Sequence, residues 1–280
     1  IKIRNKKYFF KTYLFKFYLI YRSLYNIFSK TVLLIALKLK LFSRQINQLK
    51  RVKTNIWFKS IFPANWVKNE QGLNDRHFYN VYNKKNFGLI LHLREYGKKL
   101  NILKLYGEIN RLDKNLKNNF FFPEVHLSLT DILKAQFSTF KYFFLFKKFM
   151  RENSDFNNIK MGNLKISYLI ENQFYNFYFN SFFNILLEGY STYKFFSFLK
   201  KKQILITYGE FFVHNRFAYH NFKKINFNNI IISIQHSMNG RFYGATYNNK
   251  SEFNQNNKWD SIMYSPAPDY YLAQGEQYQK

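Results

Sequence analysis

Apolar and basic residues are mixed through the first 60 positions without the two-residue period of a strand. Leu33, Leu34, Leu37 and Leu41 recur at three- and four-residue intervals, which places them on one face of a helix. The pattern predicts one or two amphipathic helices. Packing of the apolar face on the protein's own core is the favoured interpretation, and contact of the aromatic, leucine and lysine side chains with a lipid interface is the alternative.

The helical pattern breaks between Asn55 and Asp75, where Pro63 and several asparagines predict a loop-like connection. Short apolar runs at 87–93 and 100–105 follow, and both are strand candidates of an α/β domain.

Two segments in the middle of the chain predict helices. Asp131 follows Ser128 at the spacing of an N-cap with an acidic partner, so we expect a helix from there through Phe149. In 172–187 asparagines recur every fourth residue and form one polar stripe. This stripe is typical of a largely buried helix rather than of a membrane span.

The last quarter of the chain has the clearest pattern. Gln203–Tyr208 and Asn229–Ile234 are short apolar runs rich in β-branched residues, and Phe211–Lys224 between them has helical periodicity. A strand, a helix and a strand with short connections predict a βαβ unit, whose two strands are parallel. After a stretch rich in Gly, Asn and Tyr, Tyr270–Ala273 predicts a third strand.

Together these elements predict an α/β fold, in which helices flank a Rossmann-like parallel sheet and a basic, mainly helical N-terminal region precedes it. The break in the pattern places a boundary near residue 70, with a basic amphipathic helical region over 1–70 and the Rossmann-like domain over 71–280. The chain starts with Ile1 rather than Met and ends at Lys280, soon after the last predicted strand. We therefore expect it to be a fragment of a longer protein.

The formal net charge is +28, and residues 1–60 contain 15 Lys and Arg and no acidic residue. Such a segment suits an anionic membrane surface or the phosphates of a nucleic acid, and a solvated basic surface is the third interpretation. The abundance of Phe, Tyr, Asn, Ile and Lys is typical of an AT-rich genome, so composition alone says little about function. No apolar run approaches the roughly 20 residues of a membrane span. We expect a cytoplasmic location, with peripheral attachment to the inner face of the plasma membrane if residues 1–60 bind lipid.

Cysteine is absent, which excludes disulfides and thiolate metal sites. His214 and His220 are six residues apart, so they lie on different faces of the predicted helix and lack the spacing of a zinc pair. The chain has no P-loop and no Gly-x-Gly-x-x-Gly motif. We expect neither a metal nor a cofactor to bind within these residues.

Polar residues follow the two predicted strands of the βαβ unit. Glu210 comes just after the first strand, and Gln235-His236-Ser237 comes directly after the second. Ligands of parallel α/β sheets bind at the carboxyl ends of strands, so these residues are site candidates. A neutral imidazole can accept a hydroxyl proton near neutral pH, and a carboxylate suits a helix N-terminus. The structural alternatives are a histidine that caps a strand and a glutamate that caps a helix.

The order of these motifs resembles a known family. A strand ending near Glu210, a helix bearing Arg216, the sequence Ile-Ser-Ile-Gln-His-Ser at 232–237 and the sequence Pro-Asp-Tyr-Tyr-Leu-Ala-Gln-Gly-Glu at 268–276 follow one another. This succession is similar to bacterial surface-carbohydrate and capsule glycosyltransferases of the two-domain GT-B kind. The resemblance covers about residues 185–280, and Ser237 stands where many members of the family have Gly.

The resemblance implies transfer of a nucleotide-activated sugar, or a related group, to a growing surface glycan. The chain would be the acceptor-side half, with a glycan or a lipid-linked acceptor as its partner. The nucleotide-sugar donor would bind in a C-terminal domain that this chain lacks, so the chain alone would be inactive. The residues given a role by the resemblance are His236 and Glu210 as catalytic groups, and Gln235, Ser237, Arg216 and Arg241 as substrate-binding groups.

The alternative function is an RNA-binding protein of the organellar ribosomal type from an AT-rich genome. The charge of +28 with interleaved aromatic residues favours it. This alternative accounts for the basic N-terminal region, but it does not account for the polar residues at the strand ends of the βαβ unit.

Overall fold

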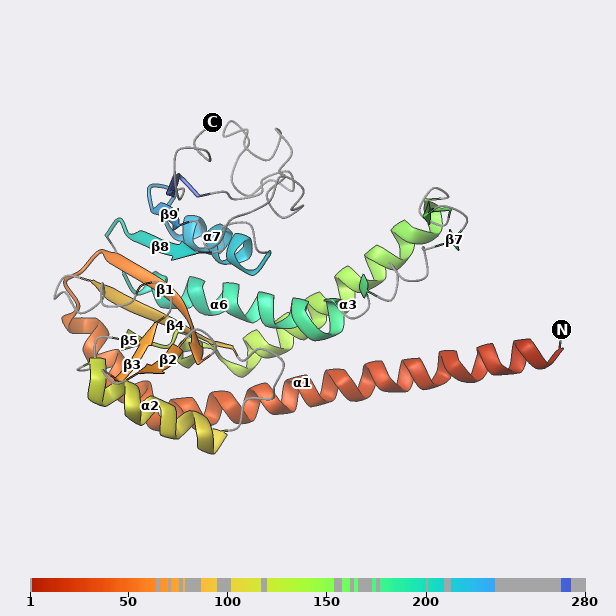
Figure 1. The fold of residues 1–280 in the computed structure, drawn as a ribbon, viewed down its shortest axis with the longest axis horizontal. Helices are drawn as coiled ribbons and strands as arrows, with labels where there is room; N and C mark the ends of the chain where they lie inside the picture. The colour runs from red at the N-terminus through yellow and green to blue at the C-terminus, as the bar shows by residue number, and fades with distance from the viewer. Residues whose placement is uncertain are drawn as a thin grey trace. The chain divides into compact units, whose positions relative to one another are not determined.

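The computed structural model in Figure 1 describes residues 2–63, 66–69, 72–75, 78, 87–94, 102–116, 120–153, 158–161, 164–165, 173–174, 177–199, 201–208, 213–234 and 268–272. They form two compact units, one of residues 1–35 with 128–187 and one of residues 36–127 with 188–280. The elements in chain order are α1 (Lys2–Arg51), β1 (Ile56–Pro63), β2 (Trp66–Asn69), β3 (Gly72–Asp75), β4 (Gly88–Arg94), α2 (Ile102–Leu116), β5 (Phe120–Phe121), η2 (Pro123–His126), α3 (Leu129–Glu152), β6 (Lys160–Met161), β7 (Leu164–Lys165), η3 (Phe177–Phe182), α6 (Phe183–Ser197), β8 (Ile204–Tyr208), α7 (Val213–Ile225), β9 (Ile230–Ile234) and β10 (Tyr270–Leu272).

The unit of residues 36–127 and 188–280 is built on one sheet of six strands, in the order β10-β9-β8-β1-β4-β5. Every neighbouring pair in this sheet is parallel. When the strands of this sheet are renumbered along the chain, β5, β4, β1, β8 and β9 give the order 3-2-1-4-5. The three-residue β10 adds a sixth strand at the β9 edge. This is the strand order of doubly wound α/β folds, so the predicted Rossmann-like parallel sheet is confirmed.

The predicted βαβ unit of the last quarter is also confirmed. The strand β8, the helix α7 and the strand β9 follow one another with short connections, and β8 pairs with β9 in parallel. The third predicted strand is β10, which pairs in parallel with β9. The strands β8 and β9 form because β-branched side chains fill a pleated, largely buried surface well.

The loop predicted between Asn55 and Asp75 is wrong, because this segment contains β1 and the antiparallel pair of β2 and β3. The strand β1 lies in the middle of the sheet between β8 and β4, and both of its faces are buried. Strands of parallel sheets are apolar on both faces, so they lack the alternation of a half-exposed strand. Lys59 interrupts the apolar run and Pro63 ends it, so the pattern did not indicate a strand.

The strand predicted at 100–105 is also wrong, because α2 begins at Ile102. Leu105, Ile109 and Leu112 are buried, and their spacing is that of one helix face. The other apolar run, at 87–93, does form a strand, which is β4.

The first 51 residues contain a single long helix, α1, where one or two were predicted. The four leucines that predicted its apolar face, Leu33, Leu34, Leu37 and Leu41, are all buried. The predicted division of the chain at residue 70 does not coincide with the two compact units, and as a statement about domains it stays a prediction.

Aromatic packing holds the helices on one face of the sheet. The indole of Trp57 on β1 meets the rings of Phe195 and Phe196 on α6 edge-on, at centroid distances of 5.2 and 5.8 Å. Gly88 on β4 is the register partner of Trp57, and a Cβ atom there would lie 2.3 Å from the indole. Glycine at position 88 therefore leaves room for the buried indole of Trp57.

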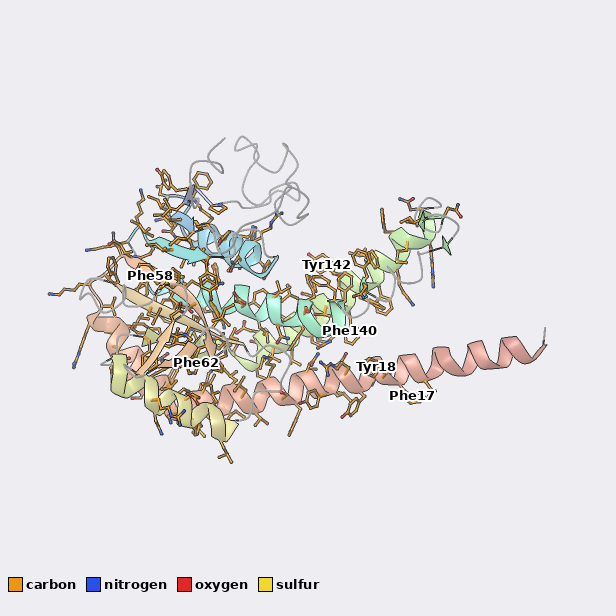
Figure 2. The ribbon with its side chains drawn as sticks, viewed as in Figure 1. Phe17, Tyr18, Phe58, Phe62, Phe140 and Tyr142 are labelled. Atoms are coloured by element: carbon orange, nitrogen blue, oxygen red, sulfur yellow. The ribbon has the colours of Figure 1, made fainter. Side chains whose placement is uncertain are left out.

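Alternate residues of β1 point to the opposite face. Phe58 and Phe62 are labelled in Figure 2. Phe58 packs against Phe78, and Phe62 against Trp66 on β2, at centroid distances of 4.9 and 5.9 Å. The hydroxyl of Ser60 donates to the carboxylate of Asp75 on β3. The β2–β3 pair therefore covers the face of β1 that α6 and α7 leave open.

The unit of residues 1–35 and 128–187 contains the first part of α1, α3, the antiparallel pair β6–β7 and η3. The predicted N-terminus of α3 is confirmed, because the backbone N–H of Ser128 donates to Asp131 Oδ2 at 2.7 Å. The helix runs three residues beyond the predicted end at Phe149, to Glu152. Among the described helices, none is long and apolar enough to cross a membrane. The rest of the predicted localisation stays a prediction.

Candidate functional site

The strand order of the sheet reverses at β1, with β4 on one side and β8 on the other. In doubly wound sheets, ligands bind beyond the carboxyl ends of the strands next to such a reversal. The strands β1 and β8 end at Pro63 and Tyr208, and β9 ends at Ile234, which is the register partner of Tyr208. The carboxyl edge of the sheet around β8 is therefore the candidate site.

Of the residues predicted for the site, Arg216 alone lies within the described part of the chain. It belongs to the first turn of α7 and is half-buried. The other five, whose roles stay predictions, lie outside the described residues: Glu210, Gln235, His236, Ser237 and Arg241.

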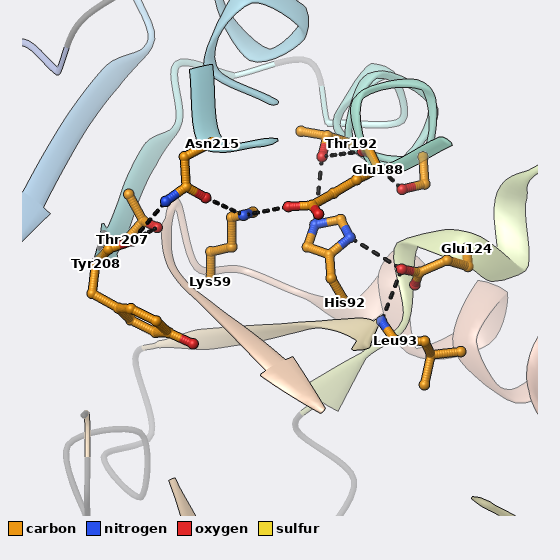
Figure 3. A network of polar contacts seen from close by, with 10 residues as sticks. Lys59, His92, Leu93, Glu124, Glu188, Thr192, Thr207, Tyr208 and Asn215 are labelled. Carbon is orange, nitrogen blue, oxygen red and sulfur yellow. Dashed lines mark hydrogen bonds and ion pairs between the residues drawn. The ribbon is translucent and has the colours of Figure 1, made fainter. Parts of the chain in front are cut away.

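A buried polar cluster lies on the α6 and α7 side of the sheet, beneath this edge (Figure 3). Lys59 on β1 is only 3% exposed, and its Nζ lies 2.6 Å from Glu188 Oε1 on α6. The same Nζ donates to Asn215 Oδ1 on α7 at 2.6 Å. Asn215 Nδ2 in turn donates to the carbonyl oxygen of Tyr208, the last residue of β8, at 2.7 Å. One chain of contacts thus joins β1, both helices and the end of β8.

The pairing of Lys59 with Glu188 is what permits a charge at this depth. Moving an isolated ammonium group out of water costs several kcal/mol even after the protein relaxes. The carboxylate of Glu188 and the amide oxygen of Asn215 replace the lost hydration with two short contacts. Such a pair adds little net stability over apolar packing, but either partner is costly to remove alone.

A second cluster is centred on His92 of β4, which is 2% exposed. Its Nδ1 lies 3.1 Å from Glu124 Oε1 on η2, and the backbone N–H of Leu93 donates to the same oxygen at 3.0 Å. A carboxylate accepts only, so Nδ1 carries the proton. The other ring nitrogen, Nε2, lies 3.5 Å from Thr192 Oγ1 on α6.

The order carboxylate, imidazole, hydroxyl in this cluster is the order of a nucleophilic triad. However, the hydroxyl of Thr192 donates to the carbonyl oxygen of Glu188 at 2.8 Å, so its proton does not point to His92. Both side chains are also enclosed. The cluster therefore holds η2 and α6 on the sheet. Because Glu188 contacts Lys59 through its side chain and Thr192 through its carbonyl, it links the two clusters (Figure 3).

His126, at the end of η2, is a buried histidine of a different kind. Burial lowers its pKa from 6.5 to about 4, and the positive charge of Lys38 acts in the same direction, while Glu124 opposes both. Its ring lies against Phe195 and Phe198, at centroid distances of 5.7 and 5.1 Å. The imidazole is therefore neutral at physiological pH and belongs to the core.

Asp269 belongs to the Pro-Asp motif that precedes β10. Its Oδ1 accepts from Lys223 Nζ on α7 at 2.6 Å, and its Oδ2 accepts from the backbone N–H of Ile231 on β9 at 2.7 Å. The carboxylate thus fixes the start of β10 to the two elements before it. This geometry assigns Asp269 a structural role.

Within the described ranges, no three His, Asp or Glu side chains are grouped as the ligands of a metal ion would be. The expectation that neither a metal nor a cofactor binds to this chain stays a prediction.

The sequence did contain a signal for the polar clusters, and it was missed. Lys59 lies within the apolar run of β1, and His92 lies within the apolar run Gly-Leu-Ile-Leu-His-Leu of β4. A charged or ionisable residue inside a buried strand needs a buried partner. The partners of Lys59 and His92, however, come from helices far along the chain, so the sequence does not identify them.

No protein-family model, curated protein or solved structure matches this chain. The fold and the site together define its class as a parallel, Rossmann-like α/β protein with a buried polar network beneath the carboxyl edge of its sheet.

Proposed function

We propose that this chain is the acceptor-side half of a GT-B-type glycosyltransferase, which transfers a nucleotide-activated sugar to a growing surface glycan. The parallel register of β8 and β9 carries the proposal. Thr207 pairs with Ser233, and Tyr208 pairs with Ile234, so the two strands end together at one edge of the sheet. In the sequence, Glu210 follows the end of β8 after one residue, Gly209, and the Gln-His-Ser motif follows directly after the end of β9. They are two of the motifs on which the resemblance to this family depends.

The polar cluster around Lys59 supports the proposal, because a transferase site needs groups held in fixed positions. Asn215 in the first turn of α7 is hydrogen-bonded to the last residue of β8, and Lys59 holds Asn215 in turn. The end of β8 and the first turn of α7 are therefore connected through Lys59 to a strand in the middle of the sheet.

In the proposed reaction, His236 accepts the proton of an acceptor hydroxyl while the hydroxyl oxygen attacks the anomeric carbon of the donor. The bond from that carbon to the donor phosphate breaks, and the nucleotide leaves with its negative charge. Arg216 and Arg241 would pair with phosphate oxygens, for which a guanidinium group offers two parallel N–H donors. Glu210 would act as the second acid/base group, and Gln235 and Ser237 would hold the acceptor sugar.

The direct test uses the full-length protein, membranes that carry the acceptor, and a set of labelled nucleotide sugars. We expect His236→Ala to lower the rate of sugar transfer by about 100-fold or more, the usual contribution of a general base. The matched control is His220→Ala, which removes a half-buried histidine whose ring stacks on Phe217 in α7. The control should keep most of the activity.

Transfer at the wild-type rate by folded His236→Ala would reject the catalytic role. No transfer from any donor, together with tight and salt-sensitive binding of structured RNA, would instead favour the RNA-binding alternative.

A further inference from the structure

A stripe of apolar side chains is exposed along α1. Phe17, Leu24 and Phe28 are 68, 63 and 70% exposed, far more than residues of this kind on a packed helix. Phe17 is labelled on this part of the helix in Figure 2. The α1 stripe consists of Leu14, Phe17, Tyr21, Leu24, Phe28 and Ile35, and it continues at Leu39 and Phe42.

The α1 stripe occupies one face of the helix. Its members are separated by three, four or seven residues, which is the spacing of a single face. Leu37 and Leu41 are fully buried and belong to a different face, so the helix has an inner apolar face and a separate outer one. Along the described part of the helix this outer face is exposed, and an exposed apolar surface of this kind marks an interaction site.

The charge of α1 indicates which partner fits. The helix contains 13 Lys and Arg and no acidic residue. Arg22 lies on one side of the stripe by helical position, and Lys38 lies on the other side. Lys40 is not part of this flank, because its Nζ donates to the carbonyl oxygen of Tyr106 and to Asn110 Oδ1 on α2. An apolar face between basic flanks matches the boundary between acyl chains and anionic headgroups.

We propose that α1 binds an anionic lipid surface, with the α1 stripe among the acyl chains and the flanking basic side chains at the headgroups. The helix lies along the surface and does not cross it, since no described helix meets the requirements of a membrane span. This inference does not depend on the proposed transferase activity.

Two other partners fit the observations less well. A nucleic acid would bind the basic residues and stack on aromatic rings, but it offers nothing to Leu14, Leu24, Ile35 and Leu39, because aliphatic side chains do not stack on bases. A second copy of the chain would bring together two helices that carry only positive charges, which repel at close distance. A lipid surface satisfies both the apolar and the basic side chains.

Flotation with vesicles tests this inference on the chain of 280 residues. We expect binding to vesicles of phosphatidylcholine with phosphatidylglycerol, weak binding to vesicles of phosphatidylcholine alone, and weaker binding in high salt. Phe17→Ala/Phe28→Ala should lower the partition coefficient about tenfold or more, because two large apolar side chains no longer enter the lipid. Alanine keeps the helix, which circular dichroism verifies.

The matched control is Leu103→Ala/Phe227→Ala, which removes two side chains that are 81 and 55% exposed but lie outside α1. We expect it to bind like the wild type. Equal binding by the Phe17→Ala/Phe28→Ala variant and the wild type would overturn the proposal. So would self-association without vesicle binding, which would assign the stripe to a second copy, or RNA binding without vesicle binding, which would assign the basic residues to a nucleic acid.

Discussion

Replacement of Glu188 by glutamine tests whether Lys59 and Glu188 form a closed, desolvated pair. The substitution keeps the size of the side chain but leaves the Lys59 ammonium, which is 3% exposed, without its counter-charge. Removing one partner of a buried pair costs about 3–5 kcal/mol, because the other charge stays buried and uncompensated. We expect the free energy of unfolding of Glu188→Gln to fall by that amount.

A double-mutant cycle separates this effect from general damage to the core. Lys59→Met should also destabilise the protein, because Glu188 then keeps a buried charge with no cation beside it. The double variant Lys59→Met/Glu188→Gln carries neither charge, so it should lose at least about 1 kcal/mol less than the sum of the single losses. Urea unfolding followed by tryptophan fluorescence measures all four proteins, since Trp57 is buried on the same strand as Lys59. Strictly additive losses would refute the reasoning and would mean that water already screens the two charges.

Three further predictions concern the frame around the site. Gly88→Ala should destabilise the protein by about 1–3 kcal/mol in urea, because its Cβ would lie 2.3 Å from the enclosed indole of Trp57. The control Gly107→Ala, on an open part of α2, should stabilise the protein by about 0.5–1 kcal/mol. The same change in the free energy of unfolding for both variants would contradict the close approach of Gly88 to Trp57. The lowered pKa of His126 means that the unfolded chain takes up a proton first, so stability should fall by up to about 3 kcal/mol as the pH drops from 6.5 to about 4. His126→Phe should lack this part of the acid loss, and an unchanged difference between the two proteins across that range would reject the assignment. Asp269→Ala should cost about 1.5–3 kcal/mol in thermal or urea unfolding, because two charge-assisted hydrogen bonds at 2.6 and 2.7 Å disappear, and an unaltered midpoint would exclude the structural role.

The sequence predicted the βαβ unit well because its local signals agree. Asn229–Ile234 is β-branched, short and followed by polar residues, and no charged residue interrupts it. The strand β1 was not predicted in this way, because Lys59 interrupts its apolar run and Pro63 ends it. The run at 100–105 failed for another reason, which is that a short apolar run fits either a strand or a helix until its neighbours are considered.

The candidate site was predictable only in part. The carboxyl edge was predictable because the two strands of the βαβ unit were expected to be parallel, and the predicted motif residues stand next to the ends of β8 and β9 in the sequence. The buried network was not predictable. Lys59 and Asn215 are 156 positions apart, and local patterns carry no information about a pairing at that distance. Only the fold brings the two side chains together.

Hydrogen exchange followed by mass spectrometry tests most directly the claim that the carboxyl edge around β8 and β9 is the binding site. The full-length protein would be compared with and without the acceptor fraction that supports sugar transfer. We predict slower exchange in peptides that begin in β8 and β9 and extend beyond Tyr208 and Ile234, and unchanged exchange in α3. Protection confined to α1 or α3, with none at the ends of β8 and β9, would contradict the account.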